Sequence, residues 1–170
     1  QEFLIDRRFG GLDGFERSEM LQLGHRHMLE DILAHKKSDP SYVPVTMPNT
    51  PQLRMTRRIG GCYTLDDTQN GEHFTDSIGI ISDWRKPGPV YEIPFRCLYG
   101  KKIKNLITAG RCISVTDAMW DISRVIPACA VTGQAAGTAA AMSNDFSVLD
   151  ISALRKNLTG VQTDISTVLS

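Results

Sequence analysis

The sequence lacks several features that would assign it to a functional class at once. Its 19 basic residues equal its 19 acidic residues, so no excess charge predicts binding to nucleic acid or to a membrane surface. Its longest weakly apolar run, 125–142, contains Pro127 and is rich in Ala and Gly, which is a poor composition for a membrane-spanning helix. The serine nucleophile motif GxSxG is absent, which removes the commonest esterase signal. We therefore expect neither nucleic acid nor a membrane as a partner.

Cysteine is also scarce and widely spaced. The four cysteines are Cys62, Cys97, Cys112 and Cys129. None forms a CxxC pair or has a histidine at metal-ligand spacing, so we predict free thiols and no metal site. Three of the four lie in apolar stretches, which favours a reducing compartment such as the cytoplasm without fixing a location. The first residues, QEFLIDRRFGG, carry no Met, no basic n-region and no apolar h-region, so we expect no signal peptide there and a longer parent protein.

Two segments have the periodicity of amphipathic helices. The first follows Ser18, a candidate N-cap, and ends before Asp39-Pro40. The second is predicted to begin at Ser152 and to stop at Gly160. Four of the eight prolines fall within 40–51, which predicts an extended connection there.

The middle of the chain is rich in strand signals. Short β-rich stretches occur at 53–65, 76–84 and 90–99, and a compact apolar strand is predicted at 105–110. Together they predict an α+β fold with a small antiparallel sheet that needs another surface to cover one face.

The stretch 105–143 combines the apolar strand, a Gly-Arg turn and a helix made mostly of Ala and Gly. Because a residue before proline avoids helical dihedrals, we predict Pro127 at the first helical position. Free N–H groups near Ala128 and Cys129 would carry a partial positive charge, and the small side chains would allow close approach to other backbones. In α/β proteins this geometry binds anionic ligand groups, but a tightly packed core helix has the same composition.

Two longer motifs carry a family resemblance. YEIPFRCLYGKKIKNLITAGRCIS followed by SRVIPACAVTGQAAGTAAA resembles the C-terminal part of the FAD-dependent oxidoreductase family, bacterial flavoproteins of the glutathione-reductase-like class that include dehydrogenases. The upstream LRMTRRIGG resembles the substrate-side region of the same family. The resemblance implies a substrate-side α+β region at 1–100. It also implies that 101–170 form the last strand and the C-terminal helix of an incomplete, Rossmann-like FAD-binding domain.

The resemblance also implies which residues face the cofactor. In this family the turn after the strand passes the ribityl and pyrophosphate region, and the following helix points its N-terminus at the N1–C2=O edge of the flavin. The positions concerned are Gly110, Arg111, Cys112, Ile113, Arg124, Val125, Ile126 and Pro127. The GxGxxG fingerprint is absent, since FGGLDGF has the wrong spacing. We therefore expect FAD to be bound in a longer protein whose N-terminal half holds the adenosine, and not by this chain alone.

Catalytic residues are less defined. Arg57 and Arg58 could bind a substrate carboxylate or stabilise negative charge beside the flavin, although adjacent strand residues point to opposite faces and either could be solvated. His73 could transfer a proton or could be a surface loop histidine. Arg124 could instead anchor its loop through Asp117 or Asp121.

Two functions stay open at this level. The chain is part of an FAD-dependent oxidoreductase acting on a small-molecule substrate, or it is a non-catalytic α+β module that binds a ligand or partner. A strand-GxGxxG-helix unit in the longer protein would distinguish them. Apolar surface on 105–110, left by an incomplete sheet, also predicts self-association.

Overall fold

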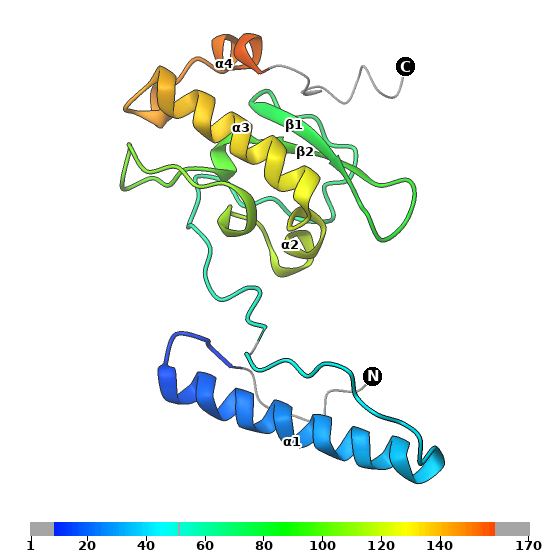
Figure 1. The fold of residues 1–170 in the computed structure, drawn as a ribbon. Helices are drawn as coiled ribbons and strands as arrows, with labels where there is room; N and C mark the ends of the chain where they lie inside the picture. The colour runs from blue at the N-terminus through cyan, green and yellow to red at the C-terminus, as the bar shows by residue number, and fades with distance from the viewer. Residues whose placement is uncertain (1–8, 51, 159–170) are drawn as a thin grey trace. The chain divides into compact units, whose positions relative to one another are not determined.

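The computed structural model describes residues 9–50 and 52–158, and the chain forms two compact units, 1–56 and 57–170 (Figure 1). This division reflects which parts of the chain pack together. The functional division into 1–100 and 101–170 stays a prediction.

The first unit contains one long helix, α1 (Gly14–Ser38). The prediction of Ser18 as N-cap is wrong, because the carboxylate of Asp13 already accepts hydrogen bonds from the backbone N–H groups of Phe15 and Glu16. Ser18 lies one turn inside the helix, where its hydroxyl donates to the carbonyl of Gly14 at 2.9 Å. The helix ends where the sequence predicts, at Asp39.

The proline-rich connection contains neither helix nor strand over 39–50, as its composition predicts. The fourth proline of this segment, Pro51, lies outside the described residues.

The second unit is built on a two-stranded antiparallel sheet of β1 (Ser77–Ser82) and β2 (Val90–Pro94). In its register Ile80 pairs with Glu92, and Ser82 pairs with Val90. Both strands are largely buried. The α+β class and the small antiparallel sheet are therefore confirmed.

The stretches 53–65 and 105–110 do not form strands among the described residues. They make only the isolated bridges Gly61–Gly100, Leu65–Val115 and Tyr99–Ile107. Two of these bridges are made by Tyr99 and Gly100, which follow the 3₁₀ helix η1 (Phe95–Cys97), where the chain leaves the extended geometry of β2, so the ladder of β2 does not continue into them. Gly61 is required where these segments cross, since a Cβ there would lie 2.5 Å from the Cβ of Ser114.

Three helices follow in the second unit. The short α2 (Asp117–Ser123) was not predicted, and the side chain of Thr116 caps it. The Ala- and Gly-rich helix is α3 (Ile126–Met142), which packs on β1. The last, α4 (Ile151–Asn157), is capped by Asp150, so its predicted start at Ser152 is corrected; Gly160 lies outside the described residues.

The core of this unit includes the contact between the sheet and α3, which Figure 1 draws beside β1 and β2. The largest side chains with almost no exposed surface come from the sheet, from η1 and from the segments around it. They include Leu65, Ile78, Ile93, Phe95, Leu98, Ile113, Met119, Ile122 and Leu154. Since α3 contributes mainly alanines to this interface, its backbone lies close to the sheet.

Within the described ranges, no single helix has the length and hydrophobicity needed to cross a membrane. Only α2 and α3 taken together have the required length and hydrophobicity, and these two helices meet at an angle of 92°.

The contact between α4 and the sheet gives the first prediction. The guanidinium of Arg155 donates to the carbonyls of Ser77 at 2.8 Å and Phe74 at 3.3 Å. Replacing Arg155 with Ala leaves these carbonyls without a charged donor, so we expect a loss of about 2 kcal/mol in the free energy of unfolding. Urea denaturation of the two proteins measures this difference in the free energy of unfolding. The neighbouring, exposed Lys156→Ala is the matched control, and equal stabilities for both variants would contradict the assigned role of Arg155.

Candidate functional site

The predicted turn and the predicted helix meet in the structure. The turn is the 3₁₀ helix η2 (Gly110–Cys112), in which Gly110 has a φ of 68°. The backbone N–H of Gly110 donates to Oγ1 of Thr132 at 2.9 Å, and the Thr132 hydroxyl is bonded in turn to carbonyls of its own helix. A side chain at position 110 would be strained by that φ, and its Cβ would lie 3.4 Å from Sγ of Cys129. Glycine at position 110 therefore allows the turn to pack directly against α3.

The N-terminus of α3 has no side-chain cap. Its N-cap is Val125, whereas Asp13, Thr116 and Asp150 cap the other α-helices of the described chain. Ile126 occupies the first helical position and Pro127 the second, which corrects the predicted start by one residue.

The backbone donors at this helix end are also corrected. The N–H of Cys129 is already bonded to the carbonyl of Val125 at 3.0 Å, so the N–H groups without a partner in the helix are those of Ile126 and Ala128. Ile126 is 85% exposed. Pro127 is exposed as well, whereas Ala128 is buried, so the exposed part of this helix end, with its partial positive charge, is its first two residues.

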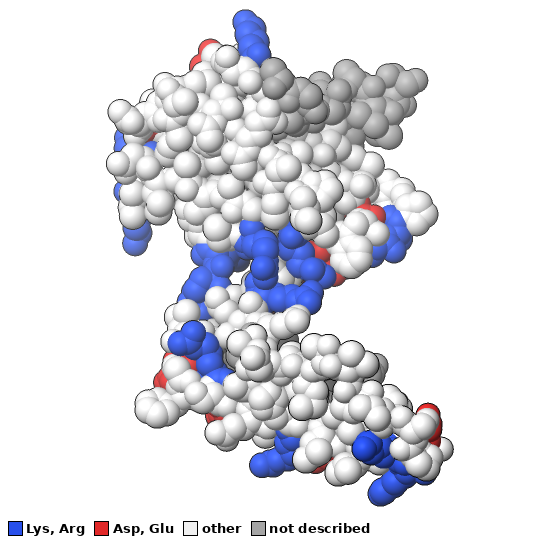
Figure 2. All heavy atoms as spheres, in the orientation of Figure 1, with Lys and Arg blue, Asp and Glu red and all other residues white. Residues whose placement is uncertain are grey.

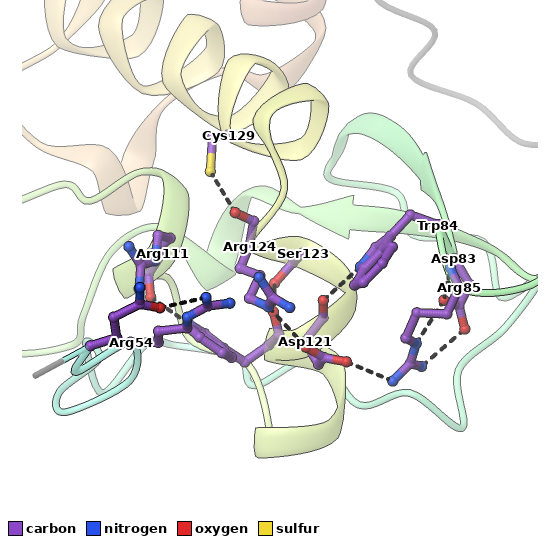
Figure 3. A network of polar contacts seen from close by, with 11 residues as sticks. Arg54, Asp83, Trp84, Arg85, Arg111, Asp121, Ser123, Arg124 and Cys129 are labelled. Carbon is purple, nitrogen blue, oxygen red and sulfur yellow. Dashed lines mark hydrogen bonds and ion pairs between the residues drawn. The ribbon is translucent and has the colours of Figure 1, made fainter. Parts of the chain in front are cut away.

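Two arginines and two tryptophans stack beside this helix end, and Figure 3 labels three of them, Arg111, Arg124 and Trp84. The guanidinium carbon of Arg124 lies 5.4 Å from the ring centre of Trp84 and 5.5 Å from that of Trp120. That of Arg111 lies 5.6 Å from the ring centre of Trp120. We call these four residues the Arg–Trp stack. Its contacts are cation–π interactions, which fix each guanidinium against a ring.

Hydrogen bonds fix the rings in turn. The indole N–H of Trp120 donates to the carbonyl of Arg111 at 3.0 Å, and that of Trp84 donates to the carbonyl of Asp121 at 2.9 Å. The stack therefore joins the η2 turn, α2 and the segment after β1.

Two carboxylates balance the charge of this region. Asp121 accepts from Nε of Arg124 at 2.8 Å and from Nη1 of Arg85 at 3.0 Å, and these bonds lower the pKa of its carboxyl. Asp83 accepts from Arg85 through both oxygens, and this hydrogen bonding lowers the pKa of Asp83 to about 2. The hypothesis that Arg124 anchors its loop through Asp121 is confirmed, while its role toward a cofactor stays a prediction.

Two pockets of the second unit bear on a ligand site, and Trp84 lines the smaller one. A pocket of about 180 Å³ opens between the end of β1 and the start of α3. It is lined by Ile80, Ile81, Ser82, Trp84, Val125, Pro127, Ala128 and Val131. A larger pocket of about 490 Å³ lies between Ile59–Gly61 and Gly100–Leu106, with Lys101 and Lys102 on its wall.

The structure brings the predicted cofactor residues together but not all the catalytic candidates. Residues 110–113 and 124–127 lie on the two segments joined by Gly110 and Thr132. Arg58 donates to Oγ of the buried Ser114 at 3.2 Å, and its neighbour Arg57 is exposed. Figure 2 shows Lys and Arg side chains grouped along the lower margin of the second unit.

His73 belongs to a different contact. It precedes β1, and its Nδ1 pairs with Oε1 of the fully buried Glu92 at 3.1 Å. Glu92 also accepts from the backbone N–H of Phe74 at 2.7 Å, which ties this loop to β2.

Several residues of the site were missed by sequence reasoning. Thr132 is the buried hydroxyl on the alanine face of α3, and its isolation among small apolar residues was a usable signal. Trp120 lies four residues before Arg124, a spacing that places two side chains on one helical face. Trp84 and Arg85 gave no such signal, because they reach the site from a distant part of the chain.

Comparison with known proteins gives one match. The family model of FAD dependent oxidoreductases matches residues 11–158, so this chain belongs to the FAD dependent oxidoreductase family. No curated protein matches significantly, and no solved structure does. Within the described ranges, no group of three or more His, Cys, Asp or Glu side chains could hold a metal ion.

The carboxylate pairing of Asp83 predicts a pH dependence. Its pKa falls from 3.8 in the unfolded chain to about 2 in the fold, so it stabilises the fold above pH 3.8, and that stabilisation is lost as the pH falls toward 2. Asp83→Asn should therefore lower the urea midpoint near neutral pH and differ little from the parent chain near pH 2.

Urea titrations across this pH range measure the effect. Asp67→Asn is the matched control, because the hydrogen bond of Asp67 to Tyr91 uses its backbone carbonyl. A difference between Asp83→Asn and the parent chain that stays constant with pH would contradict the assignment.

Proposed function

We propose that this chain forms the isoalloxazine-side wall and part of the substrate region of an FAD-dependent oxidoreductase of the glutathione-reductase-like class. The observation that carries the proposal is the uncapped N-terminus of α3, held against the turn 110–113 in a chain of this family. A helix end with unused N–H groups stabilises an electron-rich ligand edge placed before it.

The chemistry of these residues fits a flavin edge. The N–H groups of Ile126 and Ala128 are donors without a helical partner, and the guanidinium of Arg124 adds a fixed positive charge nearby. When bound, FAD supplies hydride transfer, during which negative charge increases on its ring. The role of this chain is to orient the ring and to stabilise that charge with preorganised donors.

This chain supplies only part of such a site. The pocket at the start of α3, about 180 Å³, is smaller than the roughly 300–1,000 Å³ typical of ligand sites. The GxGxxG fingerprint for the adenosine half is absent from the sequence. We therefore place 101–170 as the C-terminal part of an FAD-binding domain whose N-terminal half completes the site.

The outer face of α3 supports that arrangement. Ala130, Gly133, Gly137 and Ala140 are exposed along one side of the helix. A Cβ added at Gly133 or Gly137 meets no atom within 4 Å in the described chain, so the smallness of these residues is not explained by the packing observed. Close approach of the N-terminal half to this face would explain it.

We assign the substrate to the pocket between the segment before β1 and the segment after β2. The pocket of about 490 Å³ is large enough for a small molecule, and its wall combines Ile59 and Leu106 with two lysines. Arg57 and Arg58 immediately precede it in the sequence. These cations suit a substrate that carries a carboxylate. His73 is kept as a candidate proton donor.

The functional test uses the longer flavoprotein that contains this chain. Arg124→Ala removes a positive charge beside the region where negative charge increases, so we expect a lower flavin reduction potential or lower FAD occupancy. Arg124→Lys keeps the charge and should preserve the potential better. Spectroelectrochemistry measures the potential, and absorbance measures the bound flavin.

Arg85→Ala is the matched control for this test. Arg85 pairs with the same carboxylate, Asp121, but is not part of the Arg–Trp stack. A potential, flavin content and turnover that do not change in Arg124→Ala would show that Arg124 only anchors its loop.

A second test addresses the outer face of α3. Gly137→Leu should not destabilise the present chain, because the position is open and leucine is the better helix former by about 0.5–1 kcal/mol. In the longer flavoprotein the same change should reduce FAD retention, because overpacking typically costs about 1–3 kcal/mol. Gly24→Leu, at an equally open position in α1, is the control. Full flavin retention in Gly137→Leu would contradict packing on this face.

A further inference from the structure

Two of the four free thiols lie against the same turn. Sγ of Cys112 donates to the carbonyl of Ala109 at 3.3 Å. Sγ of Cys129, on α3, lies 3.4 Å from the place where the Cβ of a side chain at Gly110 would be. The two sulfurs therefore lie beside consecutive residues of the turn, one carried by the turn and one by the helix. The positive φ of Gly110 shapes the turn that lies between them.

The two cysteines differ in access. Cys112 is exposed, whereas Cys129 is half-buried at the start of α3 and its thiol points to the carbonyl of Arg124 at 3.6 Å. Of the other two thiols, Cys97 is fully buried and Cys62 lies half-buried on the segment before β1. An oxidant in solution would therefore reach Cys112 first.

We propose that Cys112 and Cys129 form a reversible dithiol–disulfide pair that a peroxide oxidises. This site goes beyond the proposed flavin function and does not depend on it. It uses side chains already placed at one turn, and the oxidant is a small hydroperoxide such as hydrogen peroxide.

The reaction has two balanced steps. The thiolate of Cys112 attacks one peroxide oxygen, so an S–O bond forms, the O–O bond breaks and hydroxide leaves. The thiolate of Cys129 then attacks the sulfur of the resulting sulfenic acid, so the S–S bond forms, the S–O bond breaks and hydroxide leaves again. Two thiols and one peroxide give one disulfide and two waters. A small dithiol reverses the reaction by exchange.

The electrostatics agree with this order. Burial raises the pKa of Cys129, and the negative charge of a Cys112 thiolate raises the pKa further, while Arg111 lowers it. Two thiolates side by side are thus disfavoured, whereas Cys129 can ionise once Cys112 is neutral as its sulfenic acid.

The disulfide would join η2 covalently to the first turn of α3. These two segments are otherwise connected by the hydrogen bond between Gly110 and Thr132. Oxidation would therefore add a covalent bond between two segments that this hydrogen bond already holds together.

Peptide mapping under non-reducing conditions tests the proposal on this chain. Cleavage after Lys and Arg places the four cysteines on separate peptides, 59–85, 97–101, 112–124 and 125–155. After treatment with one equivalent of hydrogen peroxide, we expect 112–124 to be linked to 125–155 within one chain. Thiol titration should show the loss of two of the four thiols, and dithiothreitol should restore both.

Three variants separate the steps. Cys129→Ser should leave Cys112 as a sulfenic acid that dimedone traps, and Cys112→Ser should leave Cys129 reduced. Cys62→Ser, which removes the other half-buried thiol, should form the linked peptides as the parent chain does. Circular dichroism before oxidation checks that each variant is folded.

The contrary results are equally definite. A link that involves 59–85, a link only between two chains, or retention of all four thiols would overturn the proposal. So would a parent chain that forms the 112–129 link no faster when folded than in urea, since the folded geometry would then contribute nothing.

Discussion

The hydrogen bond from the backbone of Gly110 to the hydroxyl of Thr132 is the contact on which this arrangement depends. It joins a turn in left-handed geometry to a helix that otherwise offers only small apolar side chains. Thr132 is almost fully buried, and its hydroxyl still donates within its own helix if the turn is displaced, but its oxygen then loses the donor that Gly110 supplies. The same contact sets the spacing between the turn and the start of α3. Cys129, Arg111 and the uncapped N–H groups are all positioned by it.

Positive charge is the second organising feature of the second unit. The Arg–Trp stack holds two guanidinium groups against two indole rings, and each indole N–H donates to a backbone carbonyl of a neighbouring segment. Asp121 neutralises Arg124 in part and links it to Arg85. Because these groups restrain one another, the guanidinium of Arg124 is held in a fixed position at the end of α2. A charge held in this way needs no reorganisation when a charged group arrives.

The two faces of helix α3 carry similarly small residues but differ in burial. Its buried face carries Ala128, Thr132, Ala135, Ala136 and Ala139, which let the helix backbone lie close to the sheet. Its outer face is equally small but is exposed in this chain. The inner face forms part of the core of the second unit. The family to which the chain belongs is FAD-dependent, and the small outer face is the surface that we propose the rest of an FAD site to cover.

The sequence by itself determined the features that depend on short-range chemistry. The spacing of apolar residues predicted α1 and α4, the prolines predicted the connection over 40–50, and the Gly-Arg turn before a small-residue helix was predicted together with the family. The α+β class followed from the same local patterns. The helix starts were misplaced by one to several residues, because a carboxylate such as Asp13 or Asp150 competes with nearby serines for the same N–H groups.

Only the tertiary structure decided how distant segments meet. Whether 53–65 and 105–110 become strands depends on a partner backbone, and the bend at η1 leaves them with single bridges. Trp84 lies against Arg124 and Arg85 against Asp121, so each contact joins residues about forty positions apart, which no local period encodes. The pairing of Cys112 with Cys129 across Gly110 has the same origin, since it requires a turn and a helix to be packed together before the distance between their side chains is defined.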